Sequence, residues 1–363
     1  MGSFLELPET YRKMEPEELA HRIRKRREDL GKRMVLLAHH YQRKEIVRLG
    51  DFIGDSYDLS SRAAAQKDAE FIVFCGVHFM AEAADILSRD SQRVFLPNPY
   101  AGCPMADMAP NAQVLRAWEE LTSVVGAGKV LPVSYMNSSA DLKAFCGRNG
   151  GLICTSSNAE KAFDYVFARA EKLFFFPDQH LGRNTANRKG IDRGRVIVWN
   201  PRKPFGGHTP ETLRNARLIL WQGHCHVHMN YSLEQVEARR REFPGVKIIV
   251  HPECREEVVD AADAAGSTKR IVTYVAQQPP GTAVAIGTEL NLVARLIEDH
   301  PDKRIMALSP DTCPICVNMF RTTLNDLAFT LDAMEAGGAN EIRVPEPVRS
   351  EARVALARML ELE

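Results

Sequence analysis

The stretch Met34-Val-Leu-Leu-Ala-His-His-Tyr41 is a short apolar run that ends abruptly in polar side chains. Such a run is typical of a strand that is buried on both faces of a sheet. Similar runs recur at 71–74, 94–96, 130–134, 173–176, 218–220, 246–250, 271–274 and 305–308. Helical patterns such as 79–87 and 233–243 lie between them. Apolar strands that alternate with helices predict an α/β fold with parallel sheets.

The ends of these strands repeat along the chain. Three of them end in a proline and a polar loop, at Pro97, Pro177 and Pro310. Three more strands run through a polar turn into a helix, near 73–79, 153–158 and 249–254. A third set of strand ends opens each unit, at 37–41, 133–137 and 220–225. We therefore expect tandem, similar αβα domains over 1–105 (with an N-terminal helix), 106–216 and 217–310. The remainder, 311–363, is expected to pack back on the first domain, and the polar, Pro- and Gly-rich segment 184–217 is expected to be a surface loop.

Composition excludes several classes of protein. The chain of 363 residues is 45% hydrophobic and 26% charged, with 47 basic and 47 acidic side chains. Zero net charge gives no basic field for nucleic acid or an anionic membrane. No apolar stretch is long enough for a membrane span, and no signal peptide is visible, so a cytoplasmic protein is expected. Eight cysteines in a reducing compartment indicate core thiols, metal ligands or redox groups, not a disulfide framework.

Unusual polar residues gather where the predicted strands end. In parallel α/β sheets, ligands bind outside the carboxyl ends of the strands. We therefore expect these ends to face one another around a central site. The residues concerned are His39, Tyr41, Tyr135, Asn137, Thr155, Ser156, Asp178, His180, Cys225, His228, His251 and Glu253.

Three of the cysteines occupy comparable places. Cys103 and Cys316 each lie six residues after the proline of a loop, and Cys225 ends a predicted strand. Three thiolates on three loops suit an iron–sulfur cluster with one iron open to substrate. The pair Cys313-Pro-Ile-Cys316 also fits a redox pair or half of a zinc site, so spacing alone leaves zinc and iron–sulfur both open. Three further cysteines, Cys75, Cys146 and Cys154, lie in or beside apolar runs and are interpreted as ordinary buried thiols, whereas Cys254 fits either role.

A series of motifs between Val35 and Leu331 resembles the quinolinate synthase family of bacterial NAD biosynthesis. The motifs are Leu-Ala-His39-His-Tyr41-Gln, Asp55-Ser56, Cys-Gly-Val-His-Phe79-Met80-Ala-Glu82, Ala-Gly-Cys103-Pro-Met-Ala-Asp107-Met, Tyr135-Met-Asn137, Cys-Thr155-Ser156-Ser157-Asn158, Pro-Asp178-Gln-His180-Leu-Gly182-Arg, Trp-Gln-Gly-His-Cys225-His-Val-His228, His251-Pro-Glu253, Gly266-Ser267-Thr268, Gly287-Thr-Glu289 and Cys316-Val-Asn318-Met319. The resemblance implies three α/β domains around a pseudo-threefold axis. It also implies a [4Fe–4S] cluster on Cys103, Cys225 and Cys316. The implied reaction joins iminoaspartate to dihydroxyacetone phosphate.

The resemblance also implies roles for individual residues. Glu253 and Tyr41 are candidates for proton transfer, and His251 and His39 for binding and polarising the substrate. The remaining candidates for substrate binding are Ser56, Tyr135, Asn137, Ser156, His228, Ser267 and Thr268, of which the three serines also suit plain helix N-caps. Because iminoaspartate is unstable, we expect an aspartate oxidase or dehydrogenase to supply it.

Two other functions fit the same residues. A zinc- or iron-dependent lyase or aldolase would use the same cavity, and metal content distinguishes it from a cluster enzyme. An iron–sulfur sensor or inactive binding protein is the other alternative. The chain argues against it because all candidate bases are present and no DNA-binding motif occurs.

Overall fold

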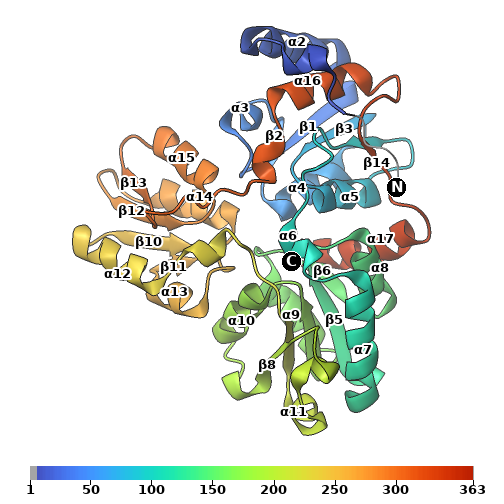
Figure 1. Ribbon diagram of the computed structural model, residues 1–363, viewed down its shortest axis with the longest axis vertical. Helices are drawn as coiled ribbons and strands as arrows, with labels where there is room; N and C mark the ends of the chain where they lie inside the picture. The colour runs from blue at the N-terminus through green and yellow to red at the C-terminus, as the bar shows by residue number, and fades with distance from the viewer. Residues whose placement is uncertain (1–5, 363) are drawn as a thin grey trace. The chain divides into compact units, whose positions relative to one another are not determined.

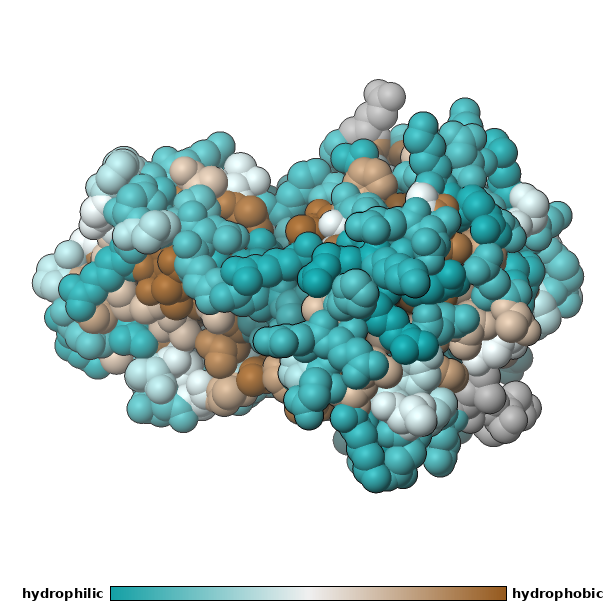
Figure 2. All heavy atoms as spheres, turned by 90° about the horizontal axis from the view of Figure 1, so that it is seen from above, coloured by the Kyte–Doolittle hydropathy of each residue, from teal (hydrophilic) through white to brown (hydrophobic). Residues whose placement is uncertain are grey.

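The structure is a computed structural model that describes residues 6–362, and it divides into two compact units. The first unit runs to Cys103 and resumes over Ile315–Pro345, and the second comprises Pro104–Pro314 and Glu346–Glu363. Figure 1 labels the helices and strands. Among the described residues no helix is both long and apolar enough to cross a membrane. The face in Figure 2 is largely hydrophilic, with hydrophobic side chains in scattered patches.

The first unit contains one five-stranded sheet of order β14-β4-β3-β1-β2. Four strands are parallel, and β14 pairs antiparallel with β4. Helix α16 packs against α2, and Leu327 and Leu331 join the core beneath β1. Its elements are α1 (Glu9–Arg12), α2 (Pro16–Leu30), η1 (Gly31–Arg33), β1 (Met34–His39), α3 (Lys44–Val47), β2 (Phe52–Gly54), α4 (Ser56–Ala65), β3 (Phe71–Cys75), α5 (His78–Leu87), β4 (Arg93–Phe95), η6 (Met319–Arg321), α16 (Leu324–Ala333) and β14 (Glu341–Ile342).

The second sheet, in the second unit, has the order β6-β5-β7-β9-β8 and is parallel throughout. Its central strand β7 is buried along its whole length, as the apolar run predicted. Its elements are α6 (Pro104–Asp107), α7 (Asn111–Val125), η2 (Ala127–Lys129), β5 (Val130–Tyr135), α8 (Ala140–Arg148), β6 (Leu152–Cys154), α9 (Ala159–Phe167), β7 (Lys172–Phe176), α10 (Gln179–Arg188), η3 (Arg193–Arg195), β8 (Val196–Trp199), η4 (Pro204–Gly207), α11 (Pro210–Asn215), β9 (Leu218–Trp221) and α17 (Val348–Leu360).

The third sheet also belongs to the second unit and has the order β11-β10-β12-β13, again parallel. It has its own apolar core around Ile248, Val250 and Leu308. Its elements are η5 (His228–Asn230), α12 (Leu233–Glu242), β10 (Lys247–Val250), α13 (Glu256–Ala261), β11 (Ala264–Ala265), α14 (Thr268–Gln277), β12 (Ala283–Gly287), α15 (Leu290–Asp299) and β13 (Arg304–Ala307).

All three sheets repeat one strand order. In each, four parallel strands lie in the order second, first, third, fourth, as β2-β1-β3-β4, β6-β5-β7-β9 and β11-β10-β12-β13. The first sheet adds β14 beside its fourth strand, and the second adds β8 beside its own. The α/β architecture with parallel sheets is thus confirmed, and the strand order recurs in the three sheets. The tandem three-domain, pseudo-threefold arrangement stays a prediction.

The strand order of the repeat corrects the predicted start of the third domain. Residues 218–221 form β9, the fourth strand of the second sheet, and do not open the third domain at 217 as the sequence had suggested. The buried run Leu218–Trp221 fits between two parallel neighbours, β7 and β8. The third sheet therefore opens with β10. The final helix α17 packs against α8 and β6 of the second sheet, so this part of 311–363 does not follow the predicted packing on the first domain (Figure 1).

Two local predictions are wrong. Residues 271–274 lie inside helix α14, where Ile271 and Val275 are buried one turn apart, so the β-branched run is an apolar helix stripe. The strand of this region is β12, which was missed. The segment 184–217 is not a loop, since it contains the second half of α10, strand β8 and helix α11.

Candidate active site

The predicted site residues sort by strand number within the repeat. The ends of the first strands carry three pairs. His39 and Tyr135 are the last residues of β1 and β5, with Tyr41 and Asn137 just beyond them, and His251 and Glu253 follow β10. The second strands are followed by hydroxyl residues, namely Ser56, Ser156, and Ser267 with Thr268. The fourth strands are followed by Cys103, Cys225 and Cys316, of which Cys316 lies farthest along the chain from its strand. Each repeat therefore supplies the same kinds of group at the carboxyl end of its sheet, where ligands of α/β proteins bind.

Within the second unit, a buried hydrogen-bonded group joins the second and third sheets. The Tyr135 hydroxyl, at the end of β5, donates to Glu253 Oε1 over 2.6 Å. Glu253 Oε2 lies 2.8 Å from His228 Nδ1, and His228 Nε2 lies 3.2 Å from Thr288 Oγ1. Tyr135, His228 and Glu253 are at most 5% exposed. Both carboxylate oxygens are thus held in place by partners from separate loops.

His251 completes this group from beside Glu253. Its ring stacks on His228 with centroids 4.4 Å apart and planes 15° apart. The Glu253 backbone N–H donates to His251 Nδ1 over 3.3 Å, which fixes the orientation of the ring. The tight His251-Pro-Glu253 turn therefore directs an imidazole and a carboxylate to the same place.

The surroundings of Glu253 keep it ionised. Burial alone raises the pKa of a carboxyl group, but His251, His228 and the hydrogen bonds from His228 and Tyr135 outweigh it and lower the Glu253 pKa below its ordinary value. Glu253 therefore lies in the structure as a hydrogen-bond acceptor of Tyr135 and His228.

Asp178 and Asn184 support this group from helix α10. Asp178, fully buried after β7, accepts the N–H groups of His180 and Leu181 and so caps the helix. Burial and the nearby charge of Glu253 raise the Asp178 pKa. One turn further on, Asn184 Nδ2 donates to the carbonyls of Pro252 and Cys254, each over 2.8 Å. Helix α10 thus holds the two residues that flank Glu253.

Asn184 was missed by sequence reasoning. It is 1% exposed, and its helix turns Leu181 and Thr185 inward on the same side. A polar residue on the buried face of an amphipathic helix signals a specific hydrogen-bonding role. That signal was present in the sequence, but the segment was interpreted as a loop from residue 184 onward.

Three histidines around Cys225 are kept neutral. Burial, followed by the charges of His224 and Arg255, lowers the pKa of His180 to about 4. Burial is also the main cause of the lowered pKa values of His224 and His226. These rings therefore offer neutral donors and acceptors near neutral pH.

The hydroxyl residues that follow the second strands differ in their roles. Ser267 caps helix α14, since its hydroxyl accepts from Arg270 N over 3.4 Å, whereas Ser56 lies one residue after the cap Asp55, and Ser156 precedes α9. Thr268 is 3% exposed, and its hydroxyl has no hydrogen-bond partner among residues 6–362. An unpaired buried hydroxyl suits contact with a ligand.

In the first unit, the loop after β1 holds His39 and Tyr41 together. The Tyr41 backbone N–H donates to His39 Nδ1 over 3.2 Å, and their rings meet edge to face with centroids 4.9 Å apart. His39 is 4% exposed. The turn therefore orients the imidazole as the His251 turn does in the third sheet.

The segment that carries Cys316 is anchored on this loop. Gln42 Nε2 lies 3.4 Å from Met319 Sδ, and Arg43 Nε donates to the Phe320 carbonyl over 2.7 Å. The Cys103 loop contributes a longer contact, from Asn98 Nδ2 to the Arg321 carbonyl at 3.4 Å. The loops of two predicted ligands thus adjoin helix η6.

Burial sorts the eight cysteines. Cys75, Cys146, Cys154 and Cys254 are fully buried, and burial raises the pKa of each. These four are thiols of the core, as predicted for the first three, and Cys254 joins them. Cys103, Cys225 and Cys316 are partly exposed, and Cys313 is exposed. Partial exposure therefore separates the three predicted ligands from the four core thiols.

Cys225 also belongs to a possible site for a single metal ion. Ligand atoms of Cys225, His228 and Glu253 all lie within 4.8 Å of one another. A cysteine, a histidine and a carboxylate suit zinc. A metal ion bound through His228 Nδ1 and Glu253 Oε2 would take the place of the hydrogen bond that joins them.

The structure therefore brings the predicted residues together in two groups. Tyr135, His228, His251 and Glu253 form one in the second unit, beside Cys225. His39 and Tyr41 form another in the first unit, next to the segment that carries Cys316. The union of both groups around one cavity stays a prediction.

Comparison with known proteins shows the family of this chain. A family model described as "Quinolinate synthetase A protein" matches residues 21–361. A quinolinate synthase of Corynebacterium glutamicum is 50% identical over 98% of this chain and 90% of its own length. One from Acidobacterium capsulatum is 50% identical over 97% and 95%, and one from Bacillus cytotoxicus is 48% identical over 98% and 96%. The chain belongs to the quinolinate synthetase A family.

Proposed function

We propose that this protein is a quinolinate synthase, which condenses iminoaspartate with dihydroxyacetone phosphate to give quinolinate, phosphate and two waters. The names of its relatives support the activity. Atoms and electrons balance between these substrates and products, so the reaction consumes no oxidant. The reaction requires phosphate loss, isomerisation, imine formation and dehydration. These steps need groups that transfer protons and groups that polarise carbonyls.

The buried group around Glu253 is the observation that carries this proposal. A carboxylate held by Tyr135 and His228, with His251 stacked alongside, provides an acceptor next to three groups that can donate. Burial strengthens each of these interactions because the local dielectric is low. Glu253 accepts a proton from the substrate carbon skeleton, and Tyr135 and His228 stabilise the carboxylate between steps.

Substrate binding falls to the helix starts and the first-strand ends. The hydroxyls of Ser56, Ser156, Ser267 and Thr268, with neighbouring backbone N–H groups, suit phosphate and carboxylate groups. Asn137 and His39 hydrogen-bond the carboxylates or the ketose oxygens. Tyr41 is held beside His39 and serves proton transfer on that side.

Cys103, Cys225 and Cys316 would hold a [4Fe–4S] cluster in this proposal. Their partial exposure fits the thiolate donors that a cluster requires, in contrast to the four buried thiols. When bound, the cluster would supply a Lewis-acidic iron for a substrate hydroxyl. The protein's own residues would place that hydroxyl and take a proton from the neighbouring carbon, so that the hydroxyl leaves as water.

Anaerobic purification followed by iron and sulfide analysis tests the cluster. We expect about four irons per chain in the wild type, the stoichiometry of such a cluster, and loss of most iron in Cys103→Ala. The matched control is Cys154→Ser, a buried thiol outside the ligand set, which should keep its iron. Wild-type protein that forms quinolinate without iron would overturn the assignment.

A zinc-dependent lyase is the second candidate, because Cys225, His228 and Glu253 lie close enough to share an ion. It predicts a colourless protein with one zinc per chain that is lost in His228→Ala. Cys103→Ala and Cys316→Ala would keep that zinc, whereas they would lose the iron of a cluster. The two sets of variants therefore separate the candidates.

The supply of iminoaspartate and the compartment belong to the same proposal. The eight cysteines form no disulfide in the structure, which suits a reducing cytoplasm. Because iminoaspartate is short-lived, we propose that an aspartate oxidase or dehydrogenase supplies it. Adding such an enzyme to oxaloacetate, ammonia and dihydroxyacetone phosphate, with aspartate present, should raise the yield of quinolinate. An unchanged yield would contradict this source.

A further inference from the structure

A cavity of about 590 Å³ lies in the second unit, and its lining residues do not include Tyr135, His228, His251 or Glu253. Its walls come from the segments that follow β7, β9 and β8, three adjacent parallel strands, and from the segment that leads into α7. The carboxyl ends of parallel strands are the usual place for a ligand. The volume also falls within the range of small-molecule sites.

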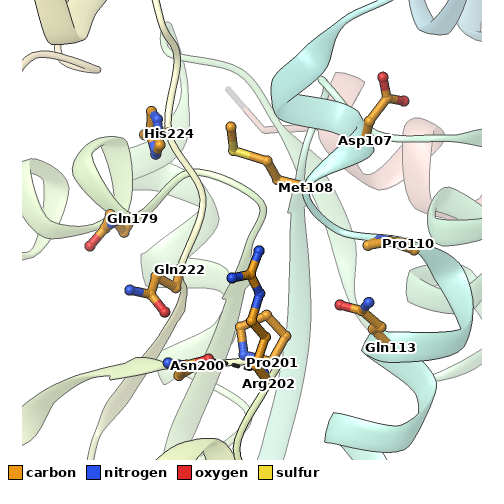
Figure 3. Close-up of a pocket in the computed structure, with 10 residues that line it drawn as sticks. All are labelled: Asp107, Met108, Pro110, Gln113, Gln179, Asn200, Pro201, Arg202, Gln222 and His224. Carbon is orange, nitrogen blue, oxygen red and sulfur yellow. Dashed lines mark hydrogen bonds between the residues drawn. The ribbon is translucent and has the colours of Figure 1, made fainter.

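Amide groups and one guanidinium surround the cavity. Figure 3 shows Arg202 extending into its middle, with Gln179, Gln222 and His224 on one side and Met108 and Gln113 on the other. Asp107, the only carboxylate that lines it among the described residues, is turned away from the guanidinium (Figure 3). The inward groups are therefore neutral or positive.

Four polar side chains of this cavity are not used by the fold. No hydrogen bond or ion pair of the Arg202 guanidinium, or of the Gln113, Gln179 and Gln222 side chains, is formed with any of residues 6–362. Arginines elsewhere in the chain commonly face a carboxylate, as Arg93 faces Glu341 at 2.7 Å. A guanidinium and several carboxamides without partners in one hollow form a recognition surface for a carboxylate.

The wall that carries Arg202 is braced. Arg202 N donates to Asn200 Oδ1 over 2.9 Å, and Asn200 N donates to the Gly206 carbonyl over 3.1 Å. Arg116 Nη2 donates to the Pro201 carbonyl over 2.7 Å. Gly206 has φ +66° and lies against Trp199, where a Cβ would come within 2.5 Å of the indole, so the turn needs glycine. The backbone is fixed while the guanidinium stays available.

We propose that this cavity is a second ligand site, which takes a small dicarboxylate through Arg202 and the surrounding carboxamides. The choice of ligand rests on the proposed function, because iminoaspartate and quinolinate are both dicarboxylates. The site adjoins the active group, since Gln179 follows the helix cap Asp178 and His224 precedes Cys225. Strand β8 and its turn, the part of 184–217 that had no assigned role, form the wall that makes it.

Equilibrium dialysis of the anaerobically purified holoprotein with labelled quinolinate tests the proposal. We expect two equivalents bound per chain in the wild type and in Lys203→Gln, the neighbouring exposed cation. In Arg202→Gln the second equivalent should bind at least about tenfold more weakly, the scale of one lost charge-assisted hydrogen bond. Nicotinamide, which has the ring but no carboxylate, should not compete for it.

Other outcomes separate this inference from the proposed function. One equivalent in the wild type that binds equally well in Arg202→Gln, or two equally tight equivalents in Arg202→Gln, would overturn the second site. Wild-type protein that makes no quinolinate but still binds an Arg202-dependent equivalent would overturn the proposed function alone.

Discussion

The carboxyl edge of the second sheet carries two polar regions of opposite character. Over β5 and β7, Tyr135 and Asp178 are buried and hydrogen-bonded, and Tyr135 reaches Glu253. Beyond β9 and β8, Arg202 and Gln222 are exposed, and no residue among 6–362 bonds their side chains. The same strand ends thus support a closed group with fixed partners and an open cavity without them. The closed group suits catalysis, because catalysis needs charged groups that are already held in place. The open cavity suits the binding of a ligand.

Replacing Glu253 by glutamine should break the closed group most severely. The amide keeps the shape but removes the negative charge that His228 and His251 surround, so we expect turnover to fall about 10²- to 10⁴-fold, the range for a lost acid–base group. Initial rates of quinolinate formation measure the loss, and iron content shows whether the cluster is kept. Glu256→Gln, in the adjoining helix α13, is the control and should stay within about twofold of wild type. Undiminished turnover would remove Glu253 from the mechanism.

Tyr135→Phe should have an intermediate effect that depends on pH. The Tyr135 hydrogen bond is one of the groups that lower the Glu253 pKa, so its loss raises that pKa. Glu253 must be ionised to accept a proton, and therefore the acid limb of the pH–rate profile should move to higher pH. We expect about a tenfold loss of rate near the acid limb. A profile that keeps its shape, with a uniform loss, would show that Tyr135 acts only through packing.

Asn184→Leu should weaken both the fold and the site. It keeps the volume but leaves the Pro252 and Cys254 carbonyls buried without donors, at a cost of about 1–3 kcal/mol each. Urea unfolding should show the loss of stability, and kcat should fall more than KM rises because the Glu253 turn loses its support. Asn187→Ala, which removes a partly exposed bond from the same helix to Glu256, is the control. Equal losses in both variants would contradict a special role for Asn184.

Arg202→Gln should have the smallest effect on stability. Its side chain is exposed and has no partner among the described residues, so the free energy of unfolding should change by less than about 0.5 kcal/mol. Urea unfolding of this variant and of Asn184→Leu gives a direct comparison of the open cavity with the closed group. A large loss of stability in Arg202→Gln would mean that the guanidinium supports the fold.

Much of this architecture was readable from the sequence because parallel strands are uniformly apolar. The runs at 34–38, 71–74 and 173–176 are strands, and the polar residues that follow them lie where α/β sheets bind ligands. The prediction at 271–274 was wrong because β-branched residues fit a buried strand and a helix stripe equally well. The local sequence pattern also does not show to which sheet a strand belongs. Strand β9 is an example, because its pairing with β7 and β8 is decided by the three-dimensional fold.

The candidate site was only partly predictable for a related reason. Strand ends identified Tyr135, His228 and Glu253 as residues of interest. Their pairing across 118 residues, from Tyr135 to Glu253, has no periodic signal in the sequence. Asn184 and Arg202 were not found because the segment that carries them was interpreted as a surface loop. A polar composition indicates exposure, but it does not show which exposed groups face one another across a cavity.

The division of the first unit across the chain has a consequence for biosynthesis. Strand β4 is synthesised before its antiparallel neighbour β14, and the core beneath β1 is incomplete until Leu327 and Leu331 of α16 are synthesised. Those residues leave the ribosome only after the intervening segment Pro104–Pro314. At about 5–20 residues per second the delay is roughly 10–40 s. The nascent first sheet therefore has an open edge during that time, and the anchored Cys316 segment is completed only after Pro104–Pro314.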